Sequence, residues 1–120
     1  MTIDPFADRL ARVRNRFVST LASKIDDTYA VLPNLSAIAP AARACVTEVY
    51  TRMHGIVGIG PAVGFPATGR AAHDVEDVLR SPYRDGRGLT AEEIAALTDS
   101  LHALREIASC ELQSFHPVSK

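Results

Sequence analysis

Residues 50–64 combine one histidine with an unusual density of glycine. His54 is followed by Gly55, Gly58 and Gly60, within a segment whose apolar residues keep a helical period. Each of these glycines costs a helix up to about 1 kcal/mol relative to alanine. A chain that tolerates this cost usually does so because side chains would obstruct something. The pattern therefore predicts an accessible imidazole with little bulk around it.

The apolar stripe of the same helix indicates where His54 points. Residues of the stripe recur every three or four positions: Ala42, Val46, Val49, Met53, Ile56 and Gly60. His54 follows Met53 by one position, so it is turned about 100° from the buried line. Gly58 lies four residues further on and neighbours His54 on the same face. We expect the ring at the surface, beside bare backbone that lets a second protein bring a charged group close.

Four segments of the chain have a helical period, and none alternates with period two. We expect helices at about 5–32, 40–61, 66–80 and 90–114. Pro82 is expected to end the third helix ahead of a polar loop over 83–88. Thr90 and Glu93 fit a capping box at the start of the fourth helix. Four amphipathic helices with short connections predict one all-α domain over 1–120, an antiparallel four-helix bundle.

The first helix carries the longest apolar stripe. Its members lie three, four or seven residues apart: Phe6, Leu10, Val13, Phe17, Leu21, Ile25 and Leu32. Charged residues between them predict a solvated opposite face. We expect the stripe to face the core along the whole helix.

The composition excludes several classes of protein. The chain has 120 residues with 13 Lys+Arg and 14 Asp+Glu, which disfavours nonspecific nucleic-acid binding. Its two cysteines, Cys45 and Cys110, are too few for a disulfide scaffold and lack zinc-site spacing. No apolar run approaches a membrane span, and the N-terminus does not resemble a signal peptide. We expect a cytoplasmic, free-standing protein, the latter from Met1 and the complete set of four helices.

The segment His54–Gly58, with Gly64 further along, resembles the signature of histidine phosphotransfer (HPt) domains. In that family the histidine is followed by an aliphatic residue at plus two and by glycine at plus four and plus ten. Ile56, Gly58 and Gly64 fill these positions. An acidic or amide residue at plus twenty-two faces the histidine in the family, and Glu76 occupies that place. The resemblance covers most of the chain and implies a four-helix bundle of the HPt type.

The resemblance implies a phosphoryl carrier of a His–Asp phosphorelay. His54 would accept the phosphoryl group from the aspartate of a receiver domain, or from a histidine kinase, and pass it to another receiver. Glu76 would orient the ring through a hydrogen bond. The chain would then be no enzyme by itself and would need no cofactor or metal, because the receiver supplies magnesium. We expect a monomer whose partners are receiver domains or a histidine kinase.

One departure from the family concerns the cation beside the phosphoryl group. The family often carries lysine at plus three, where this chain has Val57. Arg70 is our first candidate for a replacement, and Arg52 and Arg43 are others. Residues expected to dock the partner surround the histidine: Tyr50, Thr51, Gly55, Val57, Gly58 and Ile59. The same departure supports the alternative of an adaptor bundle that binds a receiver or kinase without being phosphorylated.

The other histidines offer weaker alternatives. His73, followed by Asp74, faintly resembles the His–acidic pair of kinase dimerisation helices, but the rest of that pattern is missing. His102 and His116 are expected at the surface. The four histidines do not have metal-ligand spacing, so we expect no metal site.

Overall fold

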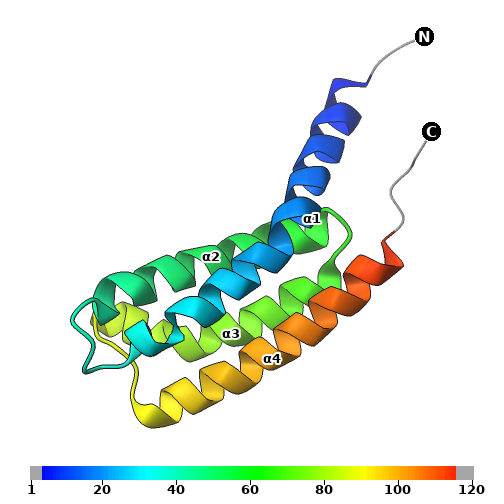
Figure 1. Ribbon diagram of the computed structural model, residues 1–120. Coiled ribbons are helices and arrows are strands. Elements are labelled where there is room, and N and C mark those ends of the chain that lie inside the picture. The colour runs from blue at the N-terminus through cyan, green and yellow to red at the C-terminus, as the bar shows by residue number, and fades with distance from the viewer. Residues whose placement is uncertain (1–3, 116–120) are drawn as a thin grey trace.

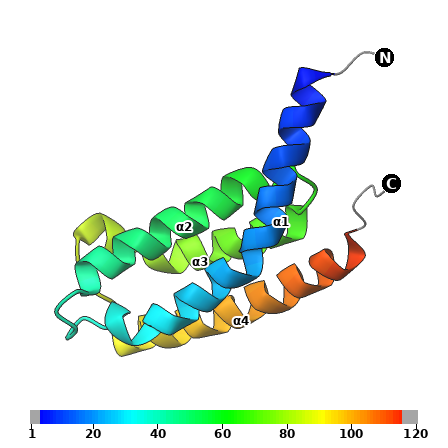
Figure 2. The same ribbon diagram turned by 45° about the horizontal axis from the view of Figure 1, so that its top comes forward.

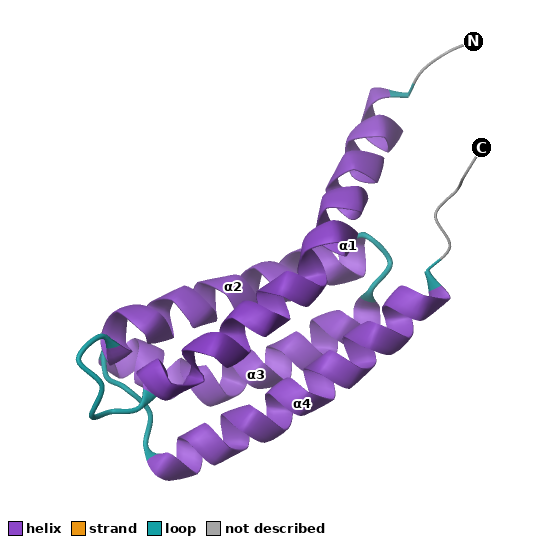
Figure 3. Ribbon diagram, in the orientation of Figure 1, coloured by secondary structure: helices purple, strands orange, loops and turns teal. Residues whose placement is uncertain are grey.

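The computed structural model describes residues 4–115 and contains four α-helices that run alternately up and down (Figure 1). These are α1 Pro5–Val31, α2 Ala42–Ala62, α3 Pro66–Asp85 and α4 Ala91–Ser114. A short 3₁₀ helix at Leu32–Leu35 follows α1. The described residues otherwise form loops (Figure 3). The predicted all-α bundle is confirmed, and none of its helices within residues 4–115 has both the length and the apolarity to cross a bilayer.

The core lies between the inward stripes of the four helices. Every member of the α2 stripe is buried: Ala42, Val46, Val49, Met53, Ile56 and Gly60. It meets α3 through Ala72, Val75 and Leu79, and α4 contributes Leu97, Leu101 and Leu104. The predicted stripe of α2 is thus correct in position and in phase, since the helix buries only a narrow face.

The predicted burial of α1 is wrong for its N-terminal half. Phe6 is 72% exposed and Val13 is 44% exposed, whereas Phe17, Leu21 and Ile25 are buried. The reason is length, because the first turns of α1 extend beyond the ends of α2 and α3 (Figures 1 and 2). The apolar period continues past the point where the bundle can cover it.

The predicted end of α3 is also wrong. The helix continues through Pro82 and ends at Asp85, so residues 83–85 are helical rather than part of a loop. Pro82 removes only one backbone donor close to the helix end, and its ring is buried. Gly86 supplies the actual stop with a left-handed conformation at φ 65°. This extra turn carries Tyr83 and extends α3 beyond Arg80.

Close contact between the end of α2 and the start of α3 sets the register of the two helices along the bundle axis. A Cβ on Gly69 would lie 2.8 Å from the Pro61 ring, and a Cβ on Gly60 would lie 3.1 Å from the Phe65 carbonyl oxygen. The turn between them needs Gly64 at φ 98°. Glycine at these positions lets the two helices approach, which fixes which residues of α3 stand opposite His54.

The N-terminus of α3 is capped from another helix. Phe65 at its N-cap has no side chain that can accept a hydrogen bond. Glu111 of α4 instead accepts from the Ala67 and Thr68 backbone nitrogens at 3.1 and 2.7 Å, and from Thr68 Oγ1 at 2.6 Å. The carboxylate satisfies amides that the helix leaves free and complements its dipole.

Candidate functional site

The His54 ring lies on the outer surface of α2, as the helix geometry predicts. Its side chain is 73% exposed, although the adjoining Met53 is fully buried. The ring therefore stands at the edge of the core, supported from below and open to solvent above. A large partner can reach it without any movement of the bundle.

A buried carboxylate of α3 holds the ring in place. His54 Nδ1 lies 2.6 Å from Glu76 Oε2, and the Glu76 side chain is only 4% exposed. A carboxylate accepts hydrogen bonds, so Nδ1 carries the proton that it donates. The neutral ring then keeps its lone pair on Nε2. One nitrogen is thus oriented by the protein and the other is left available as a nucleophile.

The glycines beside the ring do not serve helix packing. A Cβ built on Gly55 or on Gly58 would meet no heavy atom within 4 Å. Gly58 is therefore not needed for a close approach between helices, whereas Gly60 is. Bare backbone around His54 leaves room for an incoming group.

Aromatic side chains extend the site toward the end of α3. The Tyr50 ring is nearly parallel to His54, with centroids 6.2 Å apart, and stacks on Tyr83 at 4.0 Å. Tyr83 is 41% exposed. Tyr83 lies in the segment predicted to be a loop and is not among the predicted site residues. The α3 turn beyond Pro82 could have been suspected from Gly86, which is a stronger stop signal.

The other predicted docking residues divide between two faces of α2. Thr51 is exposed and Val57 is half-buried against the core, both near His54. Ile59 is 41% exposed but lines a hollow of about 240 Å³ with Val13 and Phe17 of α1. Ile59 therefore faces α1 rather than the flank that carries the ring, and its part in docking stays a prediction.

Arg70, the first candidate for the cation beside the phosphoryl group, lies away from the His54–Glu76 pair. Arg70 lines a hollow between α3 and α4 with His73, Asp74 and Ile107, not the surface over Glu76. A different arginine, Arg80, has its Nη2 3.6 Å from Glu76 Oε1. Its signal in the sequence is the four-residue spacing from Glu76, which places both on one helical face.

The two alternative arginines are engaged elsewhere. Arg52 donates to Thr28 Oγ1 at 2.9 Å and to Glu48 Oε2 at 3.1 Å. The Arg43 guanidinium lies against the Gly86 turn, where a Cβ on that glycine would be 3.4 Å from Arg43 Nε. In the part of the chain that the structure describes, neither Arg52 nor Arg43 forms a salt bridge or hydrogen bond with His54 or Glu76.

The remaining histidines have different surroundings. His73 Nδ1 lies 3.5 Å from the half-exposed Asp77, and with Asp74 these side chains gather on the outer face of α3. They lack the buried carboxylate that orients His54. His102 stacks on Tyr29, and His116 lies outside the described residues.

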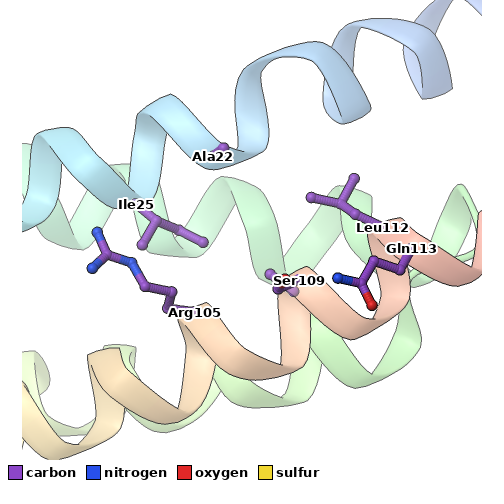
Figure 4. A pocket seen from close by; sticks show the side chains of 7 residues that line it. Ala22, Ile25, Arg105, Ser109, Leu112 and Gln113 are labelled. Carbon is purple, nitrogen blue, oxygen red and sulfur yellow. The ribbon is translucent and has the colours of Figure 1, made fainter.

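Another hollow lies on the other side of the bundle, between α1 and α4 (Figure 4). It measures about 360 Å³, and its lining is mostly apolar: Ala22, Ile25, Arg105, Ala108, Ser109, Leu112 and Gln113. The Arg105 guanidinium at the edge of this hollow forms a salt bridge with Asp26, with 2.7 Å between Arg105 Nη2 and Asp26 Oδ1. None of the predicted site residues lines this hollow.

Comparisons of the chain with protein-family models, with curated proteins and with solved structures found no match.

Proposed function

We propose that the protein is a phosphoryl carrier that accepts and returns a phosphoryl group on His54 Nε2. The observation that carries this proposal is the exposed ring whose Nδ1 is held 2.6 Å from a buried carboxylate. The resemblance of the segment around His54 to HPt domains supports it independently of the geometry. Receiver-domain aspartates and a histidine kinase are the proposed donors and acceptors.

The chemistry assigns a task to each ring nitrogen. The Nε2 lone pair forms a bond to phosphorus while the bond from phosphorus to the receiver aspartate oxygen breaks, and its electron pair stays on that carboxylate. The ring keeps its Nδ1 proton and becomes cationic. Glu76 stabilises this positive charge at 2.6 Å, as a buried acid does for a catalytic histidine. The reverse reaction returns the phosphoryl group to a second receiver.

The surface around the ring suits transfer between two proteins. Transfer requires the donor aspartate, the phosphorus and Nε2 to come into line at the surface. The open space at Gly55 and Gly58 leaves room for the receiver. Tyr50 and Tyr83 add aromatic area, of the kind that often anchors protein interfaces. Magnesium belongs to the receiver in this proposal.

An adaptor that binds a receiver without phosphorylation is the second candidate. The observation that favours it is Val57, which stands where the family often has lysine and is half-buried against the core. An adaptor would bind equally well without the imidazole. The two candidates therefore differ in what replacing His54 does.

The test is phosphotransfer from a panel of receiver domains charged with labelled acetyl phosphate. Wild type should become labelled, the label should be lost in acid and kept in base, and His54→Gln should stay unlabelled. His73→Gln is the matched control and should be labelled normally. Because His54 is exposed, His54→Gln should melt within a degree or two of wild type. Label on His54→Gln would refute the assignment, and binding without label would favour the adaptor.

A further inference from the structure

A guanidinium stands on the far side of the carboxylate that holds His54. Arg80 Nη2 is 3.6 Å from Glu76 Oε1, while His54 Nδ1 is 2.6 Å from Glu76 Oε2. Because both groups contact the same carboxylate, Arg80 Nη2 lies within about 8 Å of His54 Nδ1, the ring nitrogen that faces Glu76. The Arg80 side chain is 45% exposed, so its end can swing over the surface without unpacking the core.

Phosphorylation of His54 would change the charge balance around Glu76. A phosphoryl group on Nε2 brings up to two negative charges to the side of the ring opposite the buried carboxylate, and like charges repel across the ring. Val57 supplies no cation, and Arg70 lies in another hollow. Within residues 4–115, Arg80 is the only cation that the structure joins to the His54–Glu76 pair.

Asp77 already holds the same guanidinium. Arg80 Nη1 forms a salt bridge and hydrogen bond with Asp77 Oδ1, and this hydrogen bond raises the pKa of Arg80. Asp77 is half-exposed, so water weakens its attraction for Arg80. A dianion near Arg80 would compete with the Asp77 carboxylate for the guanidinium.

The geometry points to Arg80 as the cation that faces the phosphoryl group on His54, with Asp77 competing for it and thereby setting how long the phosphohistidine persists. This inference rests on the proposed function and specifies how the same site is regulated. Arg80 acts by stabilising the phosphorylated state. Asp77 acts through Arg80 and is a positioning residue.

The two residues should have opposite effects. Arg80→Ala removes the cation, so the half-life of phosphohistidine and its level at equilibrium with a donor should fall by about 3- to 10-fold. Arg80→Lys should restore part of this loss. Asp77→Asn frees Arg80 and should lengthen the half-life by about 2-fold or more. The differences should shrink at high ionic strength, because the groups are exposed.

The experiment uses the full chain and potassium phosphoramidate as the phosphoryl donor, with site-resolved mass spectrometry of the His54 peptide over time. Arg84→Ala is the matched control, because Arg84 lies one turn further along α3, is 69% exposed and pairs with Asp85. Its half-life should equal that of wild type. Thermal melting and the NMR signal of the His54 Nδ1 proton establish that each variant keeps the fold and the Glu76 contact.

The outcomes separate the two proposals. Normal phosphorylation of His54 with equal half-lives in wild type and Arg80→Ala would overturn the inference about Arg80 and leave the carrier function standing. An equally shortened half-life in Arg84→Ala would also overturn the inference about Arg80, because the effect would then come from the general charge of the surface. A shortened half-life in Asp77→Asn would refute the competition. A wild-type chain that takes no phosphoryl group on His54 would overturn both proposals.

Discussion

Glu76→Leu should separate the stability of the bundle from its transfer chemistry. The Glu76 carboxylate is buried, yet its side-chain partners are one exposed imidazole at 2.6 Å and one guanidinium at 3.6 Å. A buried charge with so few partners stabilises a fold little, and apolar replacements of similar volume are often neutral or stabilising. The melting temperature of Glu76→Leu should therefore be unchanged or raised by a few degrees.

Transfer should respond in the opposite direction. A hydrogen bond to a charged group contributes roughly 1.5–3 kcal/mol. Only the part gained as the His54 ring becomes cationic lowers the barrier, and the exposed ring is partly screened by water. Taking about half of it, roughly 0.7–1.5 kcal/mol, for that part predicts about a 3- to 13-fold slower transfer. Glu76→Gln keeps an acceptor for Nδ1 without the charge, so its loss should be smaller.

The assay pairs rapid-quench phosphotransfer from a charged receiver with thermal melting of the same samples. Glu76→Gln serves as the control of nearly equal shape. Transfer by Glu76→Leu at the wild-type rate would refute the role given to Glu76. A melting temperature lowered by 10 °C or more would show that the carboxylate supports the fold instead, and the slower transfer would then have another cause.

Three further predictions concern other parts of the molecule. Gly58→Glu should reduce the rate of transfer at least about 10-fold, because it places bulk and like charge beside the ring, whereas Gly58→Ala should raise the free energy of unfolding by up to about 1 kcal/mol. Rate assays check the first effect and melting curves the second. Unimpaired transfer by Gly58→Glu would refute the view that Gly58 keeps space open for the phosphoryl donor. Hydrogen bonding to Arg87 lowers the pKa of Glu93 to about 2, so Glu93→Gln should melt about 3–6 °C lower at pH 7. That difference should vanish as the pH falls from about 4.5 towards 2, because a depressed pKa stabilises the fold only while the group is ionised; a difference independent of pH would contradict the pairing. Glu111→Ala leaves the Thr68 amide and hydroxyl without their acceptor and should cost about 2–3 kcal/mol in urea unfolding, which an unchanged midpoint would refute.

Local signals in the sequence predicted those parts of the fold that depend on one helix at a time. The α2 stripe and the capping box of Thr90 and Glu93 follow from spacing alone, and both are present. The structure adds a local contact of the same kind at the start of α1, where the Asp4 carboxylate accepts from the Phe6 amide at 3.0 Å. Each of these features is decided by residues within a turn or two of one another.

Other features depend on neighbours that the local pattern does not contain. The stripe of α1 continues through Phe6, but whether another helix covers it depends on where α2 and α3 end. Pro82 is usually a stop, yet it is tolerated where only the last turn of a helix follows. The four-residue spacing places Arg80 on the same helical face as Glu76, but which residue of α2 this face meets depends on the helix register set at Gly60 and Gly69.

The way charge is placed at the site bears on the choice between carrier and adaptor. A surface that only binds a receiver needs shape and apolar area, which Tyr50 and Tyr83 already offer. It has no use for a carboxylate buried beneath an exposed ring, because desolvating that group costs free energy that docking does not recover. A ring that becomes cationic during transfer does use it, and a neighbouring guanidinium then offsets the added phosphoryl charge. The pair of Glu76 and Arg80 beside His54 therefore favours the carrier, even though Val57 removes the cation that the family often carries.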